Sequence, residues 1–513
     1  MLTTNRYSPD ITELSVSAWF YRNRTIAGFD NPARSLYVSI RELVENSLDA
    51  CEEERVLPNV SVFLKRVKDL DEVHDVLSSG SEIFELIVKD NGKGMQKEDI
   101  PVLIGKMLTG TKFTLKQSRG TFGLGGSLAL LYGQVTTQEP IEVVTGKQGD
   151  EFGHRIVMRL DIETNQPVIL KEETVEKSPQ EKGTMVSYKL HGDWIRSKRR
   201  ITDYFAMTSI IVPYASLLFE TPEGEVLQFE RIIDKLPVAP REMKPHPRGI
   251  DVELLKKMIS ATRVRTMKSF MKNSFQRVGE SIAEDFLTYV DMDPEREPST
   301  LSQQELVTLM NALAGYDRFL PPSPKSLSPA STDVLAAGIQ RLSPDFAVFK
   351  QRSPNVHEGH PFVVETGVAY GGGLNSSISV YRFANRIPLL YDERSDVTYR
   401  VVRDLNLSNY GLRSEDPLVF VMHICSTKIP YKTVGKEYIG DVDVVRREVE
   451  LGFKDCLREL GEKVRKRNRV HKQRKRENQL TEYYAFMAET LTATLKREVS
   501  TTALFGYRGG DHE

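Results

Sequence analysis

The chain has 513 residues, of which 40% are hydrophobic and 27% charged, and its formal net charge is −1. These values are typical of a globular protein with about three domains, and the balanced charge means that any nucleic-acid contact must use local basic patches. Cys51, Cys425 and Cys456 show no CxxC spacing, which excludes a disulfide or zinc framework and fits a reducing compartment. Because there is no secretory signal and no apolar run long enough to span a bilayer, we expect an intracellular protein without membrane contact.

The first predicted element is a helix that begins at Asn31 and Pro32, because Asn is favoured at the N-cap and Pro at the first helical position. An apolar stripe at helical spacing marks its core side: Leu36, Ile40, Leu43 and Ala50. Glu42 and Asn46 lie on the neighbouring face, four residues and therefore one turn apart. A carboxylate beside an amide oxygen could hold a water and Mg²⁺ against a nucleotide phosphate. We expect the helix to end near residues 57–59.

Strands and one helix follow in the first half of the chain. Strands are predicted at residues 60–64, 83–88, 141–145, 154–160 and 185–190, and a short apolar helix at residues 127–132. Helices and mixed strands in this order predict a two-layer α/β sandwich.

Two proline-rich joins, at residues 236–247 and 320–324, enclose a helical stretch. Beyond the second join, strands are predicted at residues 362–368, 378–383 and 418–425, and then a helix from Val442 onward. That helix ends in the run Lys463–Arg476, with nine Lys or Arg among fourteen positions. Such a run binds phosphates non-specifically or forms a solvated helix face. Trp194–Arg200 could be a basic loop that faces DNA, and a solvated edge is the alternative.

The segment Asp90–Gly94 follows a predicted strand and reads Asp-Asn-Gly-Lys-Gly. Two glycines allow a tight turn in which the backbone approaches a ligand closely, and a buried Asp90 could accept the exocyclic amine of adenine. The alternative is an ordinary Asp-Asn-Gly turn, which is the commoner meaning of such a string.

A glycine-rich segment, Arg119–Ser127, opens the short apolar helix. Backbone N–H groups at a helix N-terminus form an anion site, and Thr111 and Lys112 just upstream could add a hydroxyl and a cation to the phosphates. Lys112 could equally be a solvated surface lysine. The segment follows no clear strand and contains no GxxxxGK[ST], so it fits neither a dinucleotide fold nor a P-loop.

In combination, the Glu/Asn helix, the Asp-x-Gly-x-Gly turn, the glycine-rich loop and a later Gly183-Thr184 pair form the ordered motif set of the GHKL ATPases, the superfamily of gyrase, Hsp90, histidine kinases and MutL. Within it, the chain resembles the B subunits of type IIB DNA topoisomerases, the topoisomerase VI family, over nearly its whole length. The most specific strings are Phe29–Tyr37, Arg41–Ala50, His360–Glu365 and Cys425–Lys432.

The resemblance implies an α+β fold with a GHKL two-layer α/β sandwich, a helix-two-turn-helix insert and a second α/β domain, the transducer, that ends in a long helix. The divisions expected from it are an N-terminal strap at residues 1–30, the ATPase domain at 31–228, the helical domain at 229–315, the transducer at 316–470 and a basic, flexible tail at 471–513.

The resemblance also implies roles for the matching residues in binding ATP and Mg²⁺. Glu42 would be the general base that orients the attacking water, Asn46 would bind Mg²⁺, and Asp90 would bind adenine beside Gly94. The lid on the triphosphate would comprise Thr111, Lys112, Thr121, Phe122, Gly123, Leu124, Gly125, Gly126 and Ser127.

A switch lysine, implied by the same resemblance, would reach the γ-phosphate from the transducer. Lys436 is favoured because it stands five positions after Tyr431, and Lys428 and Lys432 are the alternatives. Two departures from the family pattern stand out: Ser127 replaces a frequent Lys, and Leu407–Tyr410 replaces a Trp-Lys-x-Tyr string of the transducer.

The implied function is that of the ATP-hydrolysing subunit of a type IIB topoisomerase. ATP binding would dimerise two copies and capture a DNA duplex, and a tyrosine-bearing A subunit would cleave DNA within an A2B2 heterotetramer, which relaxes supercoils and decatenates. The Asp-x-Asp strings at 291–293 and 441–443 are expected to be surface carboxylates. The protein would be cytoplasmic and nucleoid-associated in a prokaryote, or nuclear in a eukaryote. The alternatives are a MutL-like repair factor, an Hsp90-like chaperone, or a DNA scaffold that binds ATP without turnover.

Overall fold

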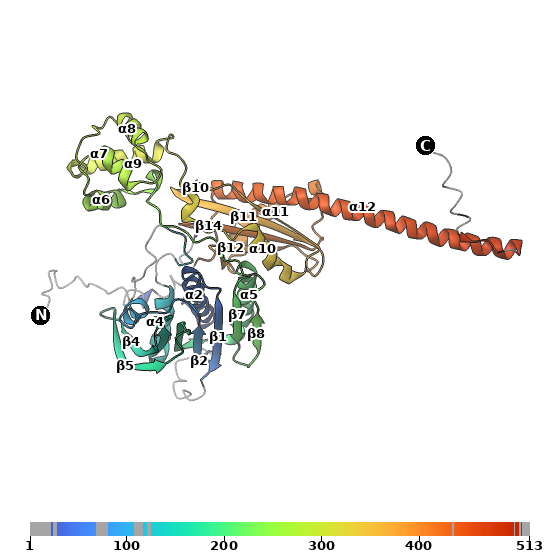
Figure 1. The fold of residues 1–513 in the computed structure, drawn as a ribbon, viewed down its shortest axis with the longest axis horizontal. Helices are drawn as coiled ribbons and strands as arrows, with labels where there is room; N and C mark the ends of the chain where they lie inside the picture. Colours follow the sequence, from blue (N-terminus) through green and yellow to red (C-terminus); the bar gives the residue numbers. More distant parts are fainter. Residues whose placement is uncertain are drawn as a thin grey trace.

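The computed structural model describes residues 22–23, 28–67, 81–106, 116–120, 125–432, 436–496, 498–501 and 504. Most of the expected N-terminal strap therefore lies outside the described residues. The described chain forms two sheet domains that pack together, a separate helical domain, and a long projecting helix (Figure 1).

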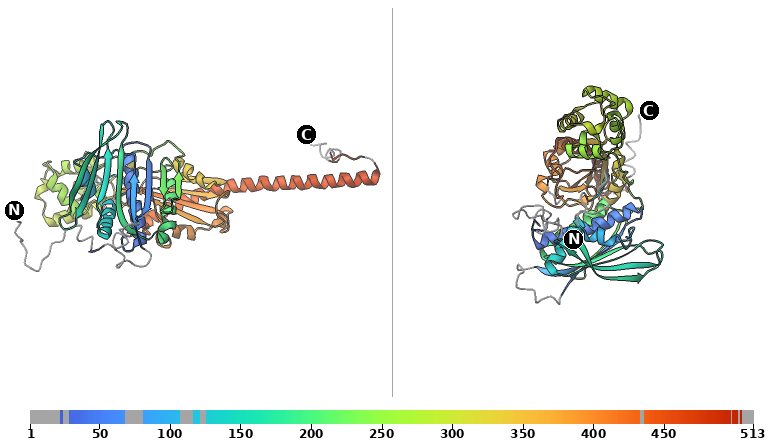
Figure 2. Two further views of the ribbon diagram at one scale, coloured as in Figure 1. Left: turned by 90° about the horizontal axis from the view of Figure 1, so that it is seen from below. Right: turned by 90° about the vertical axis from the view of Figure 1, so that its left-hand side faces the viewer.

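The first domain is an eight-stranded sheet with helices on one face. Its strands are β1 (Asn59–Arg66), β2 (Glu82–Lys89), β3 (Ile141–Gly146), β4 (Phe152–Asp161), β5 (Gln166–Glu176), β6 (Gly183–Gly192), β7 (Ser216–Glu220) and β8 (Val226–Phe229). They run in the order β5-β4-β3-β6-β2-β1-β7-β8, and all neighbours are antiparallel except β1 and β7. The helices α2 (Pro32–Glu53), α4 (Gly125–Thr137) and α5 (Trp194–Ile211) lie between this sheet and the second one (Figures 1 and 2), and the short α3 (Ile100–Gly105) lies near β4 and β5.

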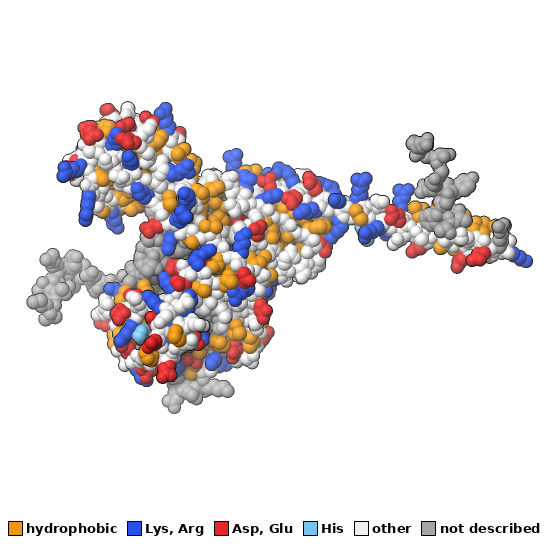
Figure 3. Space-filling view, viewed as in Figure 1, with side chains coloured by type: hydrophobic (Ala, Val, Ile, Leu, Met, Phe, Trp, Pro, Cys, Tyr) orange, Lys and Arg blue, Asp and Glu red, His pale blue; other side chains and the backbone are white. Residues whose placement is uncertain are grey.

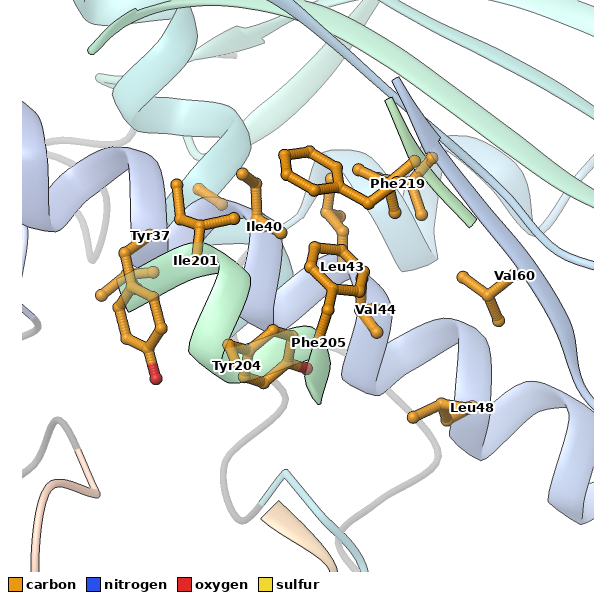
Figure 4. Close-up of a cluster of buried hydrophobic side chains, with 14 of the residues drawn as sticks. Tyr37, Ile40, Leu43, Val44, Leu48, Val60, Ile201, Tyr204, Phe205 and Phe219 are labelled. Atoms are coloured by element: carbon orange, nitrogen blue, oxygen red, sulfur yellow. The ribbon is translucent and has the colours of Figure 1, made fainter. Parts of the chain in front are cut away.

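The start of α2 agrees with the prediction. Asn31 is the N-cap, its side chain accepts a hydrogen bond from the Arg34 N–H at 2.9 Å, and Pro32 is the first helical residue. The helix ends at Glu53, slightly before the expected end. Figure 4 shows its apolar side chains packed against α5 and β7, where Phe205 and Phe219 stack with ring centroids 4.6 Å apart. This core holds α2 in place beneath the site described below.

The segment Trp194–Arg200 is the beginning of α5, so the interpretation as a loop is wrong. Asp193 caps this helix, accepting from the Arg196 N–H at 3.0 Å, and Trp194 is buried. The N-cap and the apolar stripe that follows it determine the structure of this segment more than its many charges do. The apolar stripe packs against α2 and stabilises a helix, and the charges lie on the exposed face.

The helical domain has its own core. It contains α6 (Val252–Ala261), α7 (Met267–Ser274), α8 (Glu280–Tyr289) and α9 (Gln303–Gly315), and α9 begins with a capping box between Ser302 and Glu305. Its core includes Tyr316 and Phe319, so it extends past the expected division at residue 315. The proline-rich joins connect this domain to the rest of the molecule (Figure 1).

The second sheet domain has six strands. They are β9 (Phe346–Gln351), β10 (Asn355–His357), β11 (His360–Tyr370), β12 (Ser379–Ala384), β13 (Ile387–Pro388) and β14 (Leu418–Ser426). Their order is β10-β11-β14-β12-β13, and β9 also pairs with β11. Three helices contact these strands: α10 (Thr332–Ile339), α11 (Val397–Asp404) and α12 (Asp443–Leu495).

The long helix α12 has 53 residues. Its first part packs on the second sheet through buried side chains: Val445, Val449, Phe453, Leu457, Leu460 and Val464. Its remainder projects from the body of the molecule (Figures 1 and 2). It passes residue 470 without a break, so the expected flexible tail is helical as far as Leu495. Within the described ranges, no helix combines the length and apolar character that a membrane span needs.

The two sheet domains share one hydrophobic core. Side chains of α10 and of the second sheet, such as Leu335 and Phe383, join the cluster built around α2. A Cβ atom added to Gly338 of α10 would stand 1.8 Å from the carbonyl oxygen of Ile210 in α5, so the two helices touch backbone to backbone. The second domain is therefore packed directly against the helical face of the first. These features confirm the predicted α+β class: an α/β sandwich, a helical insert, and a second α/β domain ending in a long helix.

Candidate functional site

The N-terminus of α4 lies directly against the middle of α2. A Cβ atom added to Gly125 would stand 1.7 Å from Oε2 of Glu42, and one added to Gly126 would stand 2.6 Å from Nδ2 of Asn46. Only glycine leaves room for this contact. The backbone N–H groups that begin α4 thus lie beside a carboxylate and an exposed carboxamide. Because a helix N-terminus attracts anions, this arrangement fits a phosphate group. Ser127, the third residue of α4, is buried.

Asp90 lies just after β2, and its buried carboxylate accepts three hydrogen bonds. The donors are the Ser47 hydroxyl at 2.9 Å and the N–H groups of Gly92 at 2.9 Å and Thr184 at 3.2 Å. Burial raises the pKa of Asp90, and these hydrogen bonds oppose the rise. Since Ser47 belongs to α2 and Thr184 to β6, the carboxylate is held in one orientation by two elements.

The turn after Asp90 is packed against the ends of β3 and β6. Gly94 and Gly183 have φ values of +65° and +125°. A Cβ atom at Gly94 would stand 2.2 Å from the carbonyl oxygen of Gly146, and one at Gly183 would stand 2.0 Å from that of Asp90. These close approaches require glycine. The segment is therefore more than the ordinary surface turn that was the alternative meaning of its sequence.

Lys436 comes from the second domain and reaches the middle of α2. Its ammonium nitrogen lies 3.8 Å from Oε1 of Glu42 and 3.6 Å from Oε2 of Glu45. Arg41 contacts the same two carboxylates, at 2.6 Å and 3.4 Å. The side chains of these four residues, which we call the charge cluster, are each at most 10% exposed.

The sequence pattern assigned no role to Arg41 or Glu45 of the charge cluster. Burial raises the pKa of Glu45 to about 7, Lys436 opposes this rise, and Glu42 adds to it. The i, i+3 spacing from Glu42 was visible in the sequence, but charged residues at that spacing are common on solvated helix faces. Only the contact with Lys436 of the second domain shows that this face of α2 is buried.

The other candidates for the switch lysine lie elsewhere. The ammonium group of Lys428 pairs with Glu358 at 3.1 Å, and its side chain is 59% exposed. Lys432 is also exposed. This geometry favours Lys436, as the spacing from Tyr431 did.

Six of the proposed lid residues lie outside the described residues: Thr111, Lys112, Thr121, Phe122, Gly123 and Leu124. Their roles stay predictions. The two ends of the loop are described, and they carry Arg119 on one side and Gly125 on the other. Arg119 is buried, and its carbonyl oxygen accepts a hydrogen bond from Lys436 at 3.2 Å.

Across the described part of the chain, no three His, Cys, Asp or Glu side chains group closely enough to hold a metal ion. Asp441, in one of the Asp-x-Asp strings, pairs instead with Arg400 and Arg446. Asp293, in the other, accepts from the Glu295 N–H at 3.0 Å. Both strings therefore have structural partners.

Comparison with known proteins assigns both sheet domains. Residues 34–187 match the family "Histidine kinase-, DNA gyrase B-, and HSP90-like ATPase", and residues 322–476 match "Topoisomerase VI B subunit, transducer". The B subunit of type 2 DNA topoisomerase 6 from Metallosphaera sedula is 38% identical over 94% of this chain and 90% of its own length. The corresponding protein from Sulfurisphaera tokodaii is 36% identical over 91% of this chain and 87% of its own length.

Among solved structures, the 43K ATPase domain of Thermus thermophilus gyrase B, in complex with an aminocoumarin, covers 89% of this chain and 98% of its own. The sequence identity is 12% and the TM-score is 0.37.

Proposed function

The chain belongs to the family of type 2 DNA topoisomerase 6 B subunits, and on this premise we propose that it hydrolyses ATP to drive DNA strand passage by a separate A subunit. One observation supports the proposal most: Glu42, Asn46, the N-terminus of α4 and Lys436 of the second domain meet at one place. A site built from both domains can change their relative orientation when its ligand changes.

Glu42 is the general base in the proposed reaction. It takes the proton of the water that attacks the γ-phosphate, and Arg41 and Lys436 hold its carboxylate in place. The glycines at the start of α4 let the phosphates approach that carboxylate. The amide oxygen of Asn46 would hold Mg²⁺, which neutralises phosphate charge when bound. The exposed position of Asn46 beside Gly126 fits this role.

Asp90 binds the adenine in this proposal. A carboxylate has about four acceptor positions, and three are taken by Ser47, Gly92 and Thr184. The remaining one can accept the exocyclic amine, which distinguishes adenine from guanine. The lid residues 111–112 and 121–127 then close over the triphosphate.

Lys436 couples the nucleotide to the second domain. The γ-phosphate competes with Glu42 and Glu45 for its ammonium group, so ATP favours one domain orientation and its hydrolysis products favour another. The free energy available for the movement is the difference in ATP affinity between the two orientations.

The proposed assembly is an A2B2 heterotetramer. ATP binding dimerises two copies of this chain, which capture one DNA duplex while two A subunits cleave another. Assignment of cleavage to the A subunit is supported by the structural partners of both Asp-x-Asp strings. The match of residues 322–476 to a topoisomerase transducer disfavours a MutL-like or Hsp90-like role.

The decisive variant is Glu42→Ala. We expect it to bind ATP and dimerise, but to hydrolyse ATP about 10²- to 10⁴-fold more slowly, because the general base is removed. The measurements are steady-state ATPase activity and ATP-dependent dimerisation of the full chain.

The matched control is Glu98→Ala, which removes an exposed carboxylate of the same domain and should hydrolyse ATP like the wild type. Retained turnover in Glu42→Ala would contradict the proposed role.

A further inference from the structure

The helix α2 carries four acidic side chains on one face: Glu42, Glu45, Asp49 and Glu52. Spacings of three, four and three residues place them in one line along the helix. The first two belong to the charge cluster. The last two lie outside it, and they meet two arginines that come from other segments of the chain.

Arg119, which opens the glycine-rich segment, meets both of these carboxylates. One guanidinium nitrogen lies 2.7 Å from Oδ1 of Asp49, and another lies 2.5 Å from Oε1 of Glu52. The arginine is 2% exposed. Because its carbonyl oxygen also accepts from Lys436, Arg119 links the switch lysine to the far end of α2.

Arg386, in the turn between β12 and β13, comes from the second domain and shares Glu52. Its Nη2 lies 2.7 Å from Oε2 of Glu52, and its Nη1 donates to the carbonyl oxygen of Ser328 at 2.6 Å. Its backbone N–H donates to Nε2 of His423 at 3.1 Å. Nδ1 of His423 must then carry the proton, and it donates to Glu365 at 2.7 Å. Arg386 is thus anchored deep in the second domain.

Residues 116–120, which we call the loop stem, lead into the glycine-rich segment and are also attached to the second domain. The side chain of Gln117 accepts from the Ser328 N–H at 2.6 Å, and its backbone N–H donates to the Ser326 carbonyl at 2.9 Å. The amide of Asn385 donates to the Ser118 carbonyl at 3.0 Å. The stem is therefore held by α2 on one side and by the second domain on the other.

Glu52 joins these contacts. Burial acts to raise its pKa, but Arg119 and Arg386 outweigh this effect, so its pKa lies below the usual range and the carboxylate is ionised. The hydroxyl of Tyr214 donates to the same carboxylate at 2.6 Å. A buried carboxylate between two arginines tolerates little displacement of either, because a broken buried pair leaves an uncompensated charge.

We propose that Arg119 and Arg386 are positioning residues that share Glu52, and that through this carboxylate the position of the loop stem on α2 is coupled to the orientation of the second domain. Lys436 then reaches the nucleotide only when the loop stem, residues 116–120, is correctly positioned on α2. This inference rests on the proposed function of Lys436 and extends it to residues that do not contact ATP.

The test is Arg386→Gln in the full chain, with KM for ATP and kcat measured separately. Arg386 touches none of the proposed nucleotide ligands, so we expect KM to change by less than about twofold. We expect kcat to fall by about ten- to a hundredfold, the effect of a misplaced reacting group. Arg386→Lys, which keeps the charge, should recover part of kcat. Glu52→Gln should resemble Arg386→Gln, and the double variant should be no worse than either single variant.

Arg352→Gln is the control for general destabilisation. Arg352 also lies in the second domain and pairs with two carboxylates, Glu448 at 2.8 Å and Asp455 at 3.1 Å, but these belong to α12 and not to α2. We expect it to keep the wild-type kcat. The fraction of folded sites is counted in each variant by binding of a non-hydrolysable ATP analogue, and kcat is expressed per bound analogue.

The inference is overturned if Arg386→Gln and Glu52→Gln keep the wild-type kcat per site, or if Arg352→Gln loses kcat equally. If Arg386→Gln does not fold, Glu52→Gln, which retains both arginines, decides alone by the same criterion. Failure of the proposed function is a separate result, since it appears as turnover by Glu42→Ala.

Discussion

Two carboxylates of α2, and not one, share the ammonium group of Lys436. Glu42 and Glu45 lie 3.8 Å and 3.6 Å from it, and Arg41 supplies a second cation. Burial is the main cause of the raised pKa of Glu45, about 7; Lys436 opposes the rise, and repulsion from Glu42 adds to it. The carboxylate proposed as general base therefore has a neighbour that titrates near neutral pH.

Glu45 should make the stability of the chain fall as pH rises. Its pKa is the ordinary value of 4.5 in the unfolded chain and about 7 in the folded chain, so between these values the folded state binds more protons than the unfolded state. Stability therefore decreases with pH across this window and is constant above it. Glu45→Gln lacks the titration, so its Tm relative to the wild type should rise by roughly 2–4 °C between pH 5 and pH 8.

Thermal unfolding at the two pH values measures this difference. Glu98→Gln, at an exposed position, is the control and should track the wild type at both. An equal Tm difference between Glu45→Gln and the wild type at pH 5 and pH 8 would show that Glu45 is ionised throughout.

At the scale of elements, the contact between α2 and α4 shapes the site. The N-terminus of α4 approaches α2 so closely that Gly125 and Gly126 leave no space for a side chain. The apolar residues of α4, such as Leu128 and Leu130, are buried in the shared core and keep the helix in this position. The glycines are therefore needed for helix packing, and in the proposed site they also give the phosphates access.

Gly125→Ala should reduce ATP hydrolysis without unfolding the domain. Its Cβ atom would stand 1.7 Å from Oε2 of Glu42, so the carboxylate or the start of α4 must move by about 1 Å, which lowers kcat by about a hundredfold. Steady-state ATPase measurements test this. In the control Gly315→Ala, at the end of α9, the added Cβ atom meets nothing within 4 Å, and kcat should be unchanged. A wild-type kcat for Gly125→Ala would mean that the helices separate during turnover.

At the scale of the whole molecule, α12 connects the nucleotide-binding part to a distant point. Its buried first part is fixed to the second sheet, and its continuation carries the basic run Lys463–Arg476 (Figure 3). Rotation of the second domain about α2 would swing the far end of α12 through a larger distance, since a helix rises about 1.5 Å per residue. The helix can therefore transmit a small movement at Lys436 over the length of the molecule.

If the basic run binds DNA, its contacts should depend strongly on salt. Lys472 and Arg474 are exposed, and replacing both with Gln should reduce the slope of log K against log salt by up to about 1.8, or 0.9 for each lost phosphate contact. DNA binding of the full chain, titrated over salt concentrations, measures the slope. A control that replaces Lys171 and Lys235, two exposed lysines of other regions, should leave it unchanged. If the wild type and both double variants gave equal slopes, the basic run of α12 would be a solvated helix face that does not contact DNA.

Much of the fold was predictable because its signals are local. The Asn31-Pro32 helix start, the strands that became β1, β2, β3, β4 and β6, and the glycines before α4 follow from capping, alternation and backbone freedom. Trp194–Arg200 was predicted wrongly because its charges concealed a helix that is selected by packing against α2. The tail beyond residue 470 was also predicted wrongly, since a polar helix lacks the apolar pattern by which helices are recognised.

The sequence by itself determined which side chains could bind a triphosphate, because Glu42, Asn46, Asp90 and the glycines lie in motifs whose spacing has local meaning. The resemblance also favoured Lys436, but only the tertiary structure decided which charged partners surround the site. Lys436, Arg386 and Arg119 are far from α2 along the chain, and their pairing with its four carboxylates depends on how the second domain packs against the first. A charged residue in a sequence does not indicate its partner, because in water each charge can be solvated on its own. Burial removes that water, and each charge must then pair with another.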